Sequence, residues 1–240
     1  MIWMWFAALL AFFIKGLCGF ANTLVFTTLT SFSSSIVHIS PIMVLINYPT
    51  NLIMVWNGRK AIDYRICVPL CIMVIAGIIP GTFFFTNMDT RMLEAIFGVV
   101  VVVIALEMLL NRRQAHPAGQ KVGWKMSLLG VLSGFVCGFC NTGVLVGAYL
   151  SKVTDDTQAF KANACVVYFL SDNIKLLMFL CLGVLNTDIL LEALSIFPVA
   201  MLGLWLGMKS SKIMNEAVAR KAVLVMLVIS GLGLIINSLT

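Results

Sequence analysis

The hexapeptide CGFANT, at Cys18 to Thr23, recurs as CGFCNT at Cys137 to Thr142, and each copy lies inside a long apolar stretch. At membrane depth, helix-breaking and polar residues are tolerated only where they face protein or a watery cavity. A break that occurs once in each half of a chain is typical of transporters, whose two halves build one central site.

The composition is that of an integral membrane protein. Of the 240 residues 61% are hydrophobic and 11% are charged, and the mean hydropathy is +1.04. Soluble domains are about half apolar and about a quarter charged. Apolar runs of about 20 residues predict helices in a lipid bilayer rather than the strands of a barrel. The net charge of +6 comes from loop lysines and arginines, which report orientation in a membrane protein, so we expect no nucleic-acid partner.

The second half of the chain repeats the first. CGFANT falls on CGFCNT at an offset of 119 residues, and after a three-residue insertion an offset of 122 places Asn51 on Asn173. Two motifs in the same order predict a gene duplication. We therefore expect a first transmembrane repeat over residues 1–110, a cytoplasmic linker over 111–125 and a second transmembrane repeat over 126–240.

The distribution of basic residues predicts how the eight apolar runs cross the membrane. If all eight cross from a cytoplasmic N-terminus, seven loop lysines and arginines lie on each side, against the positive-inside rule. If instead the first and fifth runs turn at their break and leave on the side they entered, thirteen loop lysines and arginines are cytoplasmic and Arg91 alone is outside. The eight runs cover roughly residues 3–32, 39–56, 66–85, 92–110, 126–150, 162–185, 189–208 and 222–237.

The fold class predicted in this way is an all-α polytopic membrane protein. Each repeat has a re-entrant or broken helical hairpin plus three transmembrane helices. Because three crossings is an odd number, the two repeats have inverted topology. The alternative is eight full crossings in two parallel repeats.

The hairpin tips are the predicted anion site. The outgoing leg of each hairpin begins near Asn22–Thr23 or Asn141–Thr142, and the first turn of a helix presents unpaired N–H groups and a partial positive charge. Two such ends brought together by symmetry form a cradle for an anion, with Gly19 and Gly138 permitting the tight turns. The alternative is that these residues only satisfy the broken backbone.

Two lysines within apolar runs are candidates for positive charge at this site, because buried charges in a bilayer are costly and rare. Lys15 precedes the first break, and its alternative role is a side chain that reaches the membrane surface. Lys175 follows Asp172 by three residues, so both lie on one helical face. Asp172 is either half of a structural ion pair or a proton acceptor that gates the charge of Lys175.

Asn51 and Asn173 are matched amides on the second helix of each repeat, and both are candidates to face the hairpin tips. Pro49 lacks a backbone donor, so local unwinding is expected near it. The alternative role of the two amides is hydrogen bonding between helices.

Other chemistry has little support in the sequence. Cys137 and Cys140 have the spacing of a thiol redox pair, but the first copy has Ala21 in place of Cys140. The only histidines are His38 and His116, in loops, so we expect no metal site and no cofactor. The sequence has no nucleotide-binding loop, so we expect a gradient or the membrane potential to drive transport, unless a separate subunit supplies the energy. We expect the chain not to be an enzyme.

The glycine-bearing breaks, the repeat after about 120 residues and the stretch ANACVVYFLSDNIKLLMFL resemble the sulfite exporter TauE/SafE family of the toluene sulfonate uptake permease superfamily. The resemblance implies transport of small sulfur-containing anions, such as sulfite, thiosulfate, sulfoacetate or other organosulfonates, across the bacterial inner membrane, with proton coupling in some members. It places the family's glycine-rich break on the two hexapeptides and its second-repeat asparagine on Asn173. The family's run of glycines is replaced here by Ala21–Asn22 and Cys140–Asn141.

The sequence as a whole therefore predicts a secondary transporter of small sulfur anions that works by alternating access around a midplane site. An anion channel and a membrane thiol-redox protein using Cys137 and Cys140 are the alternatives. The sequence leaves open the direction of transport, the coupling ion and whether the chain acts alone or as a homodimer.

Overall fold

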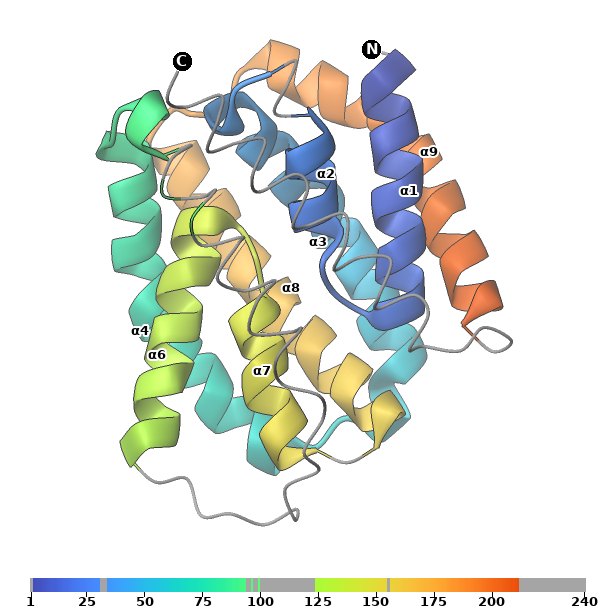
Figure 1. Cartoon of the computed structure of the whole chain (residues 1–240), viewed down its shortest axis with the longest axis vertical. Helices are drawn as coiled ribbons and strands as arrows, with labels where there is room; N and C mark the ends of the chain where they lie inside the picture. The colour runs from blue at the N-terminus through green and yellow to red at the C-terminus, as the bar shows by residue number, and fades with distance from the viewer. Residues whose placement is uncertain are drawn as a thin grey trace. The chain divides into compact units, whose positions relative to one another are not determined.

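The structure of the chain is a computed structural model that describes residues 2–30, 34–93, 96, 99, 124–154 and 156–211. Within these ranges the chain forms helices joined by short connections, with no strand. The predicted run 222–237, most of the run 92–110 and most of the linker 111–125 lie outside the described residues. The helices are α1 (Ile2–Cys18), α2 (Asn22–Thr30), α3 (Ile36–Gly58), the 3-10 helix η1 (Arg59–Ala61), α4 (Tyr64–Asn87), α6 (Trp124–Cys140), α7 (Val144–Val153), α8 (Thr157–Cys181) and α9 (Thr187–Ser210) (Figure 1).

Four of these helices are long and apolar enough to cross a membrane. They cover Ile36–Ala61, Tyr64–Asn87, Gln158–Cys181 and Thr187–Ser210, and their mean hydropathy lies between 1.3 and 2.3. By contrast, α1 and α6 have 17 residues each, about 25 Å, which is less than a hydrocarbon core of about 30 Å. In the described part of the chain, the spanning helices are therefore the second and third helices predicted for each repeat.

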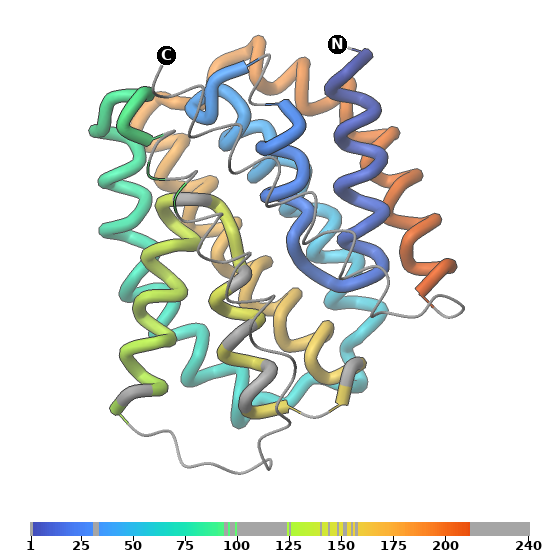
Figure 2. The backbone as a smooth tube through the Cα atoms, in the orientation of Figure 1, coloured from blue at the N-terminus to red at the C-terminus, as the bar shows by residue number. Residues whose placement is uncertain are grey.

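The first apolar run is divided into two antiparallel helices. The backbone leaves α1 at Cys18, reverses, and enters α2 at Asn22 (Figure 2). The indole Nε1 of Trp3, at the start of α1, donates a hydrogen bond to Leu29 O, near the end of α2, at 2.7 Å. Both ends of this segment therefore lie at the same edge, so the segment turns back instead of passing straight through.

The fifth apolar run is divided in the same manner. Here α6 ends at Cys140 and α7 begins at Val144, with the two helices packed against each other (Figure 2). With only ten residues, α7 is about 15 Å long. Neither the first nor the fifth run is one continuous helix, which argues against the alternative of eight full crossings.

The helices form two compact units that do not follow the order of the chain. One unit contains α1, α2, the start of α3 as far as Ile46, and α9. The other contains the rest of α3 from Asn47, together with α4, α6, α7 and α8. Each unit thus combines helices from both halves of the sequence. The repeat boundaries at 110 and 126 remain a prediction, because a compact unit and a duplicated segment are different divisions of a chain.

In the first unit, α1 packs against α9 through glycines that let the two backbones approach closely. A Cβ added to Gly203 would meet Leu9 O at 2.5 Å, and one added to Gly16 would meet Leu204 O at 2.6 Å. Gly207 likewise lies directly against Phe13 O. Small residues spaced four apart are a common device for close helix packing in membranes.

The second unit repeats this crossing with α6 and α4. Gly77 and Gly81 of α4 lie against Val131 O and Phe135 O of α6, and a Cβ added to Gly138 would meet Ile78 O at 2.5 Å. Gly138 therefore takes the place of Gly16, 122 residues earlier. The helix ends agree with this spacing, because Cys140 follows Cys18 and Val144 follows Asn22 by 122 residues. At the breaks, the helix ends and the glycine contacts thus recur after 122 residues, whereas the matching hexapeptides recur after 119 residues.

The first spanning helix, α3, shows one departure from expectation. We predicted local unwinding near Pro49, but α3 runs without interruption from Ile36 to Gly58. The Thr50 hydroxyl donates to Asn47 O at 3.0 Å in this turn. The hydroxyl of Thr50 thus adds a hydrogen bond in the turn that contains Pro49, and Pro49 has no backbone N–H to donate.

Candidate functional site

The turn of the second break is made by Asn141. Its φ is +52°, in the left-handed region that asparagine tolerates better than most residues. Gly138, which we predicted to permit this turn, lies inside α6, and its contact with α4 is what requires a glycine. The prediction that Gly138 permits the turn was wrong because the hexapeptide is displaced by three residues, nearly one helical turn, relative to the first break. Its predicted contact with the anion remains a prediction.

The side chain of Asn141 joins this turn to Lys175 of α8. Lys175 Nζ donates to Asn141 Oδ1 at 3.3 Å, and both residues are buried, at 0% and 7% exposure. Because an ammonium only donates, the amide oxygen must face Lys175 and the amide nitrogen must point away from it. Asn141 Nδ2 is buried and has no hydrogen-bond partner among the described residues. A buried donor without a partner costs free energy, so a ligand that accepts from it would stabilise the site.

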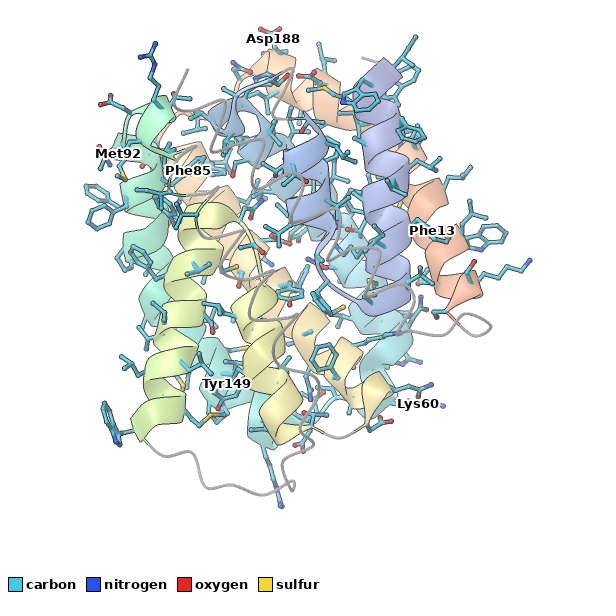
Figure 3. All side chains as sticks on the ribbon, viewed as in Figure 1. Phe13, Lys60, Phe85, Met92, Tyr149 and Asp188 are labelled. Carbon is cyan, nitrogen blue, oxygen red and sulfur yellow. The ribbon has the colours of Figure 1, made fainter. Side chains whose placement is uncertain are left out.

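Lys175 lies between two aromatic rings. Its Nζ is 5.5 Å from the ring centroid of Phe85 on α4 and 5.5 Å from that of Phe179 on its own helix. Figure 3 labels Phe85 near the end of α4. The faces of aromatic rings attract cations, so the two rings and the amide oxygen of Asn141 hold a positive charge in a buried position.

Asp172 lies on the same face of α8, one turn before Lys175. Its Oδ2 accepts a hydrogen bond from Asn51 Nδ2 of α3 at 2.6 Å, and both residues are buried. Asn51 Oδ1 has no hydrogen-bond partner among the described residues. This contact brings together two of the predicted site residues, and it is also the helix-to-helix hydrogen bond that we considered as the alternative for Asn51.

The matched amides Asn51 and Asn173 have different surroundings. Asn173 Nδ2 donates to Phe169 O of its own helix at 2.7 Å, and the residue is only partly buried. Asp172 is the residue that contacts Asn51. The role predicted for Asn173 in the site remains a prediction.

Tyr168 lies against the second break, one turn before Asp172 on α8. Its hydroxyl donates to Gly143 O at 2.7 Å. Thr142, between Asn141 and Gly143, is buried. We did not predict a role for Tyr168, Gly143 or Phe85. Positions three or four residues apart share one face of a helix. This spacing would have identified a stripe on α8 made of Tyr168, Asp172, Lys175 and Phe179.

The first break is built differently. Gly19 and Ala21 have φ of +86° and +72°, so the turn is made before Asn22, where we predicted the outgoing helix to begin. Asn22 and Thr23 occupy the first turn of α2 and are buried. Gly19 permits the turn, as expected. These residues belong to the other compact unit, so the predicted meeting of the two tips remains a prediction.

Lys15 is buried near the end of α1, with an exposure of 1%. Its Nζ is 5.4 Å from the ring centroid of Phe12. The charge is thus held inside the protein, which excludes the alternative of a side chain that reaches the membrane surface. Its structural counterpart in the second repeat is Cys137, at the spacing of 122, where the hexapeptide register gave Gly134.

The described residues hold no cluster of three or more His, Cys, Asp or Glu side chains suited to a metal ion. Cys137 is a buried free thiol in α6. The side chain of Cys140 is outside the described residues, so the proposed thiol pair has no geometry to support it.

Comparison with known proteins identifies the family of this chain. The family model described as "Sulfite exporter TauE/SafE" matches residues 4–234 of the chain. The chain belongs to the sulfite exporter TauE/SafE family. This confirms the resemblance found in the sequence, and it makes the chain a multi-pass membrane protein of a sulfur-anion exporter and permease family. TauE/SafE is a family of transporters, in agreement with the expectation that the chain is not an enzyme. No curated protein and no solved structure matches the chain.

Proposed function

We propose that the chain is a secondary transporter of small sulfur-containing anions, such as sulfite, thiosulfate or organosulfonates, and that the anion binds at the second break. The observation that carries this proposal is Asn141. Its amide nitrogen is a buried donor without a partner among the described residues, and its amide oxygen contacts the buried ammonium of Lys175. An anion placed there would accept from the amide and be attracted by the ammonium.

The start of α7 adds to this attraction. Among the described residues, no side-chain hydrogen bond caps α7 at Gly143. The first N–H groups of a helix and the positive end of its dipole favour an anion. Thr142 is a further donor beside the break. We also propose contacts to the anion from the first unit, by Lys15, Gly19, Asn22 and Thr23. The helices α3 and α8 contribute the proposed contacts Asn51 and Asn173.

Alternating access is the proposed mechanism, with two inverted repeats that exchange roles. The two glycine crossings support this proposal. In each, the first helix of one half packs against the second spanning helix of the other half, α1 against α9 and α6 against α4. A two-fold relation between the repeats explains why both crossings use the same pattern of contacts. We propose residues 1–110 and 126–240 as these repeats, joined by a cytoplasmic linker.

Asp172 is the proposed site of proton coupling. Its carboxylate now accepts from Asn51 Nδ2, and Asn51 Oδ1 is a buried acceptor without a partner among the described residues. Rotation of the amide would let the same asparagine accept a hydrogen bond from a protonated Asp172. Asn51 is therefore suited to both protonation states. Even without coupling, a membrane potential of about −100 mV favours the exit of a monovalent anion by about 2.3 kcal/mol.

The proposed location is the bacterial inner membrane, with the basic ends of the spanning helices in the cytoplasm. Arg59 stacks on Trp56 with its guanidinium carbon 4.7 Å from the ring centroid, and Lys209 Nζ lies 5.2 Å from that of Trp205. Aromatic and basic residues together are typical of a membrane–water interface on the cytoplasmic side. These contacts support the assignment made from the charge distribution.

Flux measurements on the purified protein in liposomes test the proposal. We expect saturable uptake of labelled sulfite or thiosulfate that is blocked by the unlabelled anions and less by sulfate or taurine. Saturation and counterflow distinguish a carrier from an anion channel. The double variant Cys137→Ala/Cys140→Ala should keep its flux, whereas a thiol relay would lose all activity. Absence of saturable flux for every sulfur anion in the wild-type protein would contradict the proposed function.

A further inference from the structure

We propose that Tyr168 is a positioning residue for the anion site, which holds the second break in the shape that presents Asn141 and the start of α7. This inference rests on the proposed function. It concerns a residue that binds no anion itself and acts through the backbone that it contacts.

The contact between Tyr168 and Gly143 involves both the hydroxyl and the ring. The hydroxyl donates to Gly143 O at 2.7 Å, and the same carbonyl accepts from Gly147 N at 3.0 Å in the first turn of α7. Tyr168 therefore bonds to the carbonyl at which α7 begins. Fixing that carbonyl fixes the direction of the first N–H groups of the helix, since both belong to the same turn.

The ring of Tyr168 occupies the space that a side chain on residue 143 would need. A Cβ added to Gly143 would meet the ring carbons Cε1 and Cζ and the hydroxyl. The φ of Gly143 is −97°, which any residue adopts. The ring of Tyr168, and not the backbone conformation, is thus what requires glycine at this position.

Tyr168 also couples the break to the charged residues. It lies on the stripe of α8 that carries Asp172 and Lys175, one and two turns further along, and Lys175 contacts Asn141 on the other side of the break. One rigid helix face therefore holds the break at two points, Asn141 and Gly143. A change in either contact should alter how well the site accepts an anion.

The first break has different residues at the positions of Tyr168 and Gly143. At the structural spacing of 122 residues, the counterparts of Tyr168 and Gly143 are Ile46 and Ala21, and Ile46 has no hydroxyl to donate. The positioning role is therefore specific to the second break, which is where the proposed anion contacts Asn141.

Tyr168→Phe tests the hydrogen bond with little change of shape. We expect the half-saturation concentration for sulfite in proteoliposomes to rise about threefold to tenfold, as for the loss of one hydrogen bond, with the maximal rate within about twofold of wild type. A merely structural tyrosine would lower the yield or the maximal rate and leave half-saturation unchanged. Tyr149→Phe is the matched control, because it removes the hydroxyl of another buried tyrosine, six residues beyond Gly143, and should match wild type (Figure 3).

Gly143→Ala tests whether the ring of Tyr168 excludes a side chain at residue 143. A second substitution, at Tyr168, tests whether the ring is the cause of the effect. Gly143→Ala should lower sulfite flux at least about tenfold, because the new Cβ meets the ring of Tyr168. Gly143→Ala/Tyr168→Val makes room for that Cβ and should recover flux at least about threefold over Gly143→Ala alone. If Gly143→Ala does not fold, the flux of the double variant and the half-saturation concentration of Tyr168→Phe still test the inference.

Half-saturation in Tyr168→Phe equal to that in wild type and Tyr149→Phe would overturn the inference, as would a double variant no better than Gly143→Ala. Absence of wild-type flux for every sulfur anion is a separate outcome. It would overturn the proposed function, and the inference with it.

Discussion

At the first break α1 ends at Cys18 and the backbone turns through Gly19 and Ala21, whereas at the second break α6 continues to Cys140 and the turn falls on Asn141. The same six-letter motif thus contributes its asparagine to the first turn of a helix in one half and to the turn itself in the other. Helix ends and glycine contacts repeat at 122 residues, and the motif repeats at 119.

We propose that the two breaks contribute differently to anion binding. The second break has an amide donor, a buried ammonium, a carboxylate and a tyrosine within one unit. At the structural counterparts of Asn141, Asp172 and Lys175 the first half has Gly19, Thr50 and Ile53. The two glycine crossings use the same pattern of contacts, whereas the polar residues at the two breaks differ. The following predictions test this difference from the largest expected effect to the smallest.

Lys175→Met should have the largest effect. It keeps an unbranched side chain of similar length and removes the charge, and a hydrogen bond that involves a charged group contributes about 1.5–3 kcal/mol. We expect sulfite flux in proteoliposomes to fall about tenfold to a hundredfold with unchanged protein yield. Lys15→Met removes the buried lysine of the first unit, and we expect it to lower the flux less than Lys175→Met does. If Lys15→Met abolishes flux and Lys175→Met does not, the charge that matters belongs to the first break.

Asn141→Gly gives the second break the residue that the first break has at the equivalent position, Gly19. Glycine retains the positive φ, so the substitution removes the amide without straining the backbone. Flux should fall about tenfold through a higher half-saturation concentration, because an amide donor to an anion is lost. Asn22→Gly is the matched variant at the first break, and we expect its effect on half-saturation to be smaller. Equal effects of the two substitutions would show that the breaks contribute alike.

Gly19→Ala tests the turn of the first break. At a φ of +86° an alanine Cβ is unfavourable by about 1–2 kcal/mol, whereas asparagine is tolerated better. The thermal unfolding midpoint in detergent should therefore fall for Gly19→Ala and fall less for Gly19→Asn. The opposite order would mean that close packing, and not the backbone conformation, selects glycine there.

His38→Gln should have the smallest effect. His38 Nε2 lies 2.7 Å from Glu192 Oε2, between α3 and α9 of the first unit, and the His38 side chain is 39% exposed. The contact is partly exposed and we expect it to contribute about 0–1 kcal/mol, so both the midpoint and the flux should stay close to wild type. Glu192→Gln should behave in the same way. A tenfold loss of flux in either variant would place the first unit at the centre of transport.

The sequence predicted the class of fold and the existence of the breaks, because composition, charge distribution and duplicated motifs are visible in a single chain. It also predicted the start of α2 at Asn22. It misplaced the second turn, because matching letters aligned Gly138 with Gly19, whereas packing against Ile78 places Gly138 in the role of Gly16. Helix ends in a membrane protein are set by contacts between helices, which no local pattern encodes.

The candidate site was only partly predictable for a related reason. Asn141, Lys175, Asp172 and Asn51 were identified as polar residues in apolar runs, and the structure joins them in two pairs, Asn141 with Lys175 and Asn51 with Asp172. Phe85 was not identified, because an apolar residue in an apolar helix gives no signal. Its contact with the ammonium of Lys175 depends on how α4 packs against α8.

The most direct test of the central claim is an experimental structure of the protein with thiosulfate, whose sulfur atoms can be located by anomalous scattering. We predict an anion at the second break, about 3 Å from Asn141 Nδ2 and within reach of Lys175 Nζ. An anion bound only at the first break, with Asn141 and Lys175 unchanged and in contact with each other, would contradict the account.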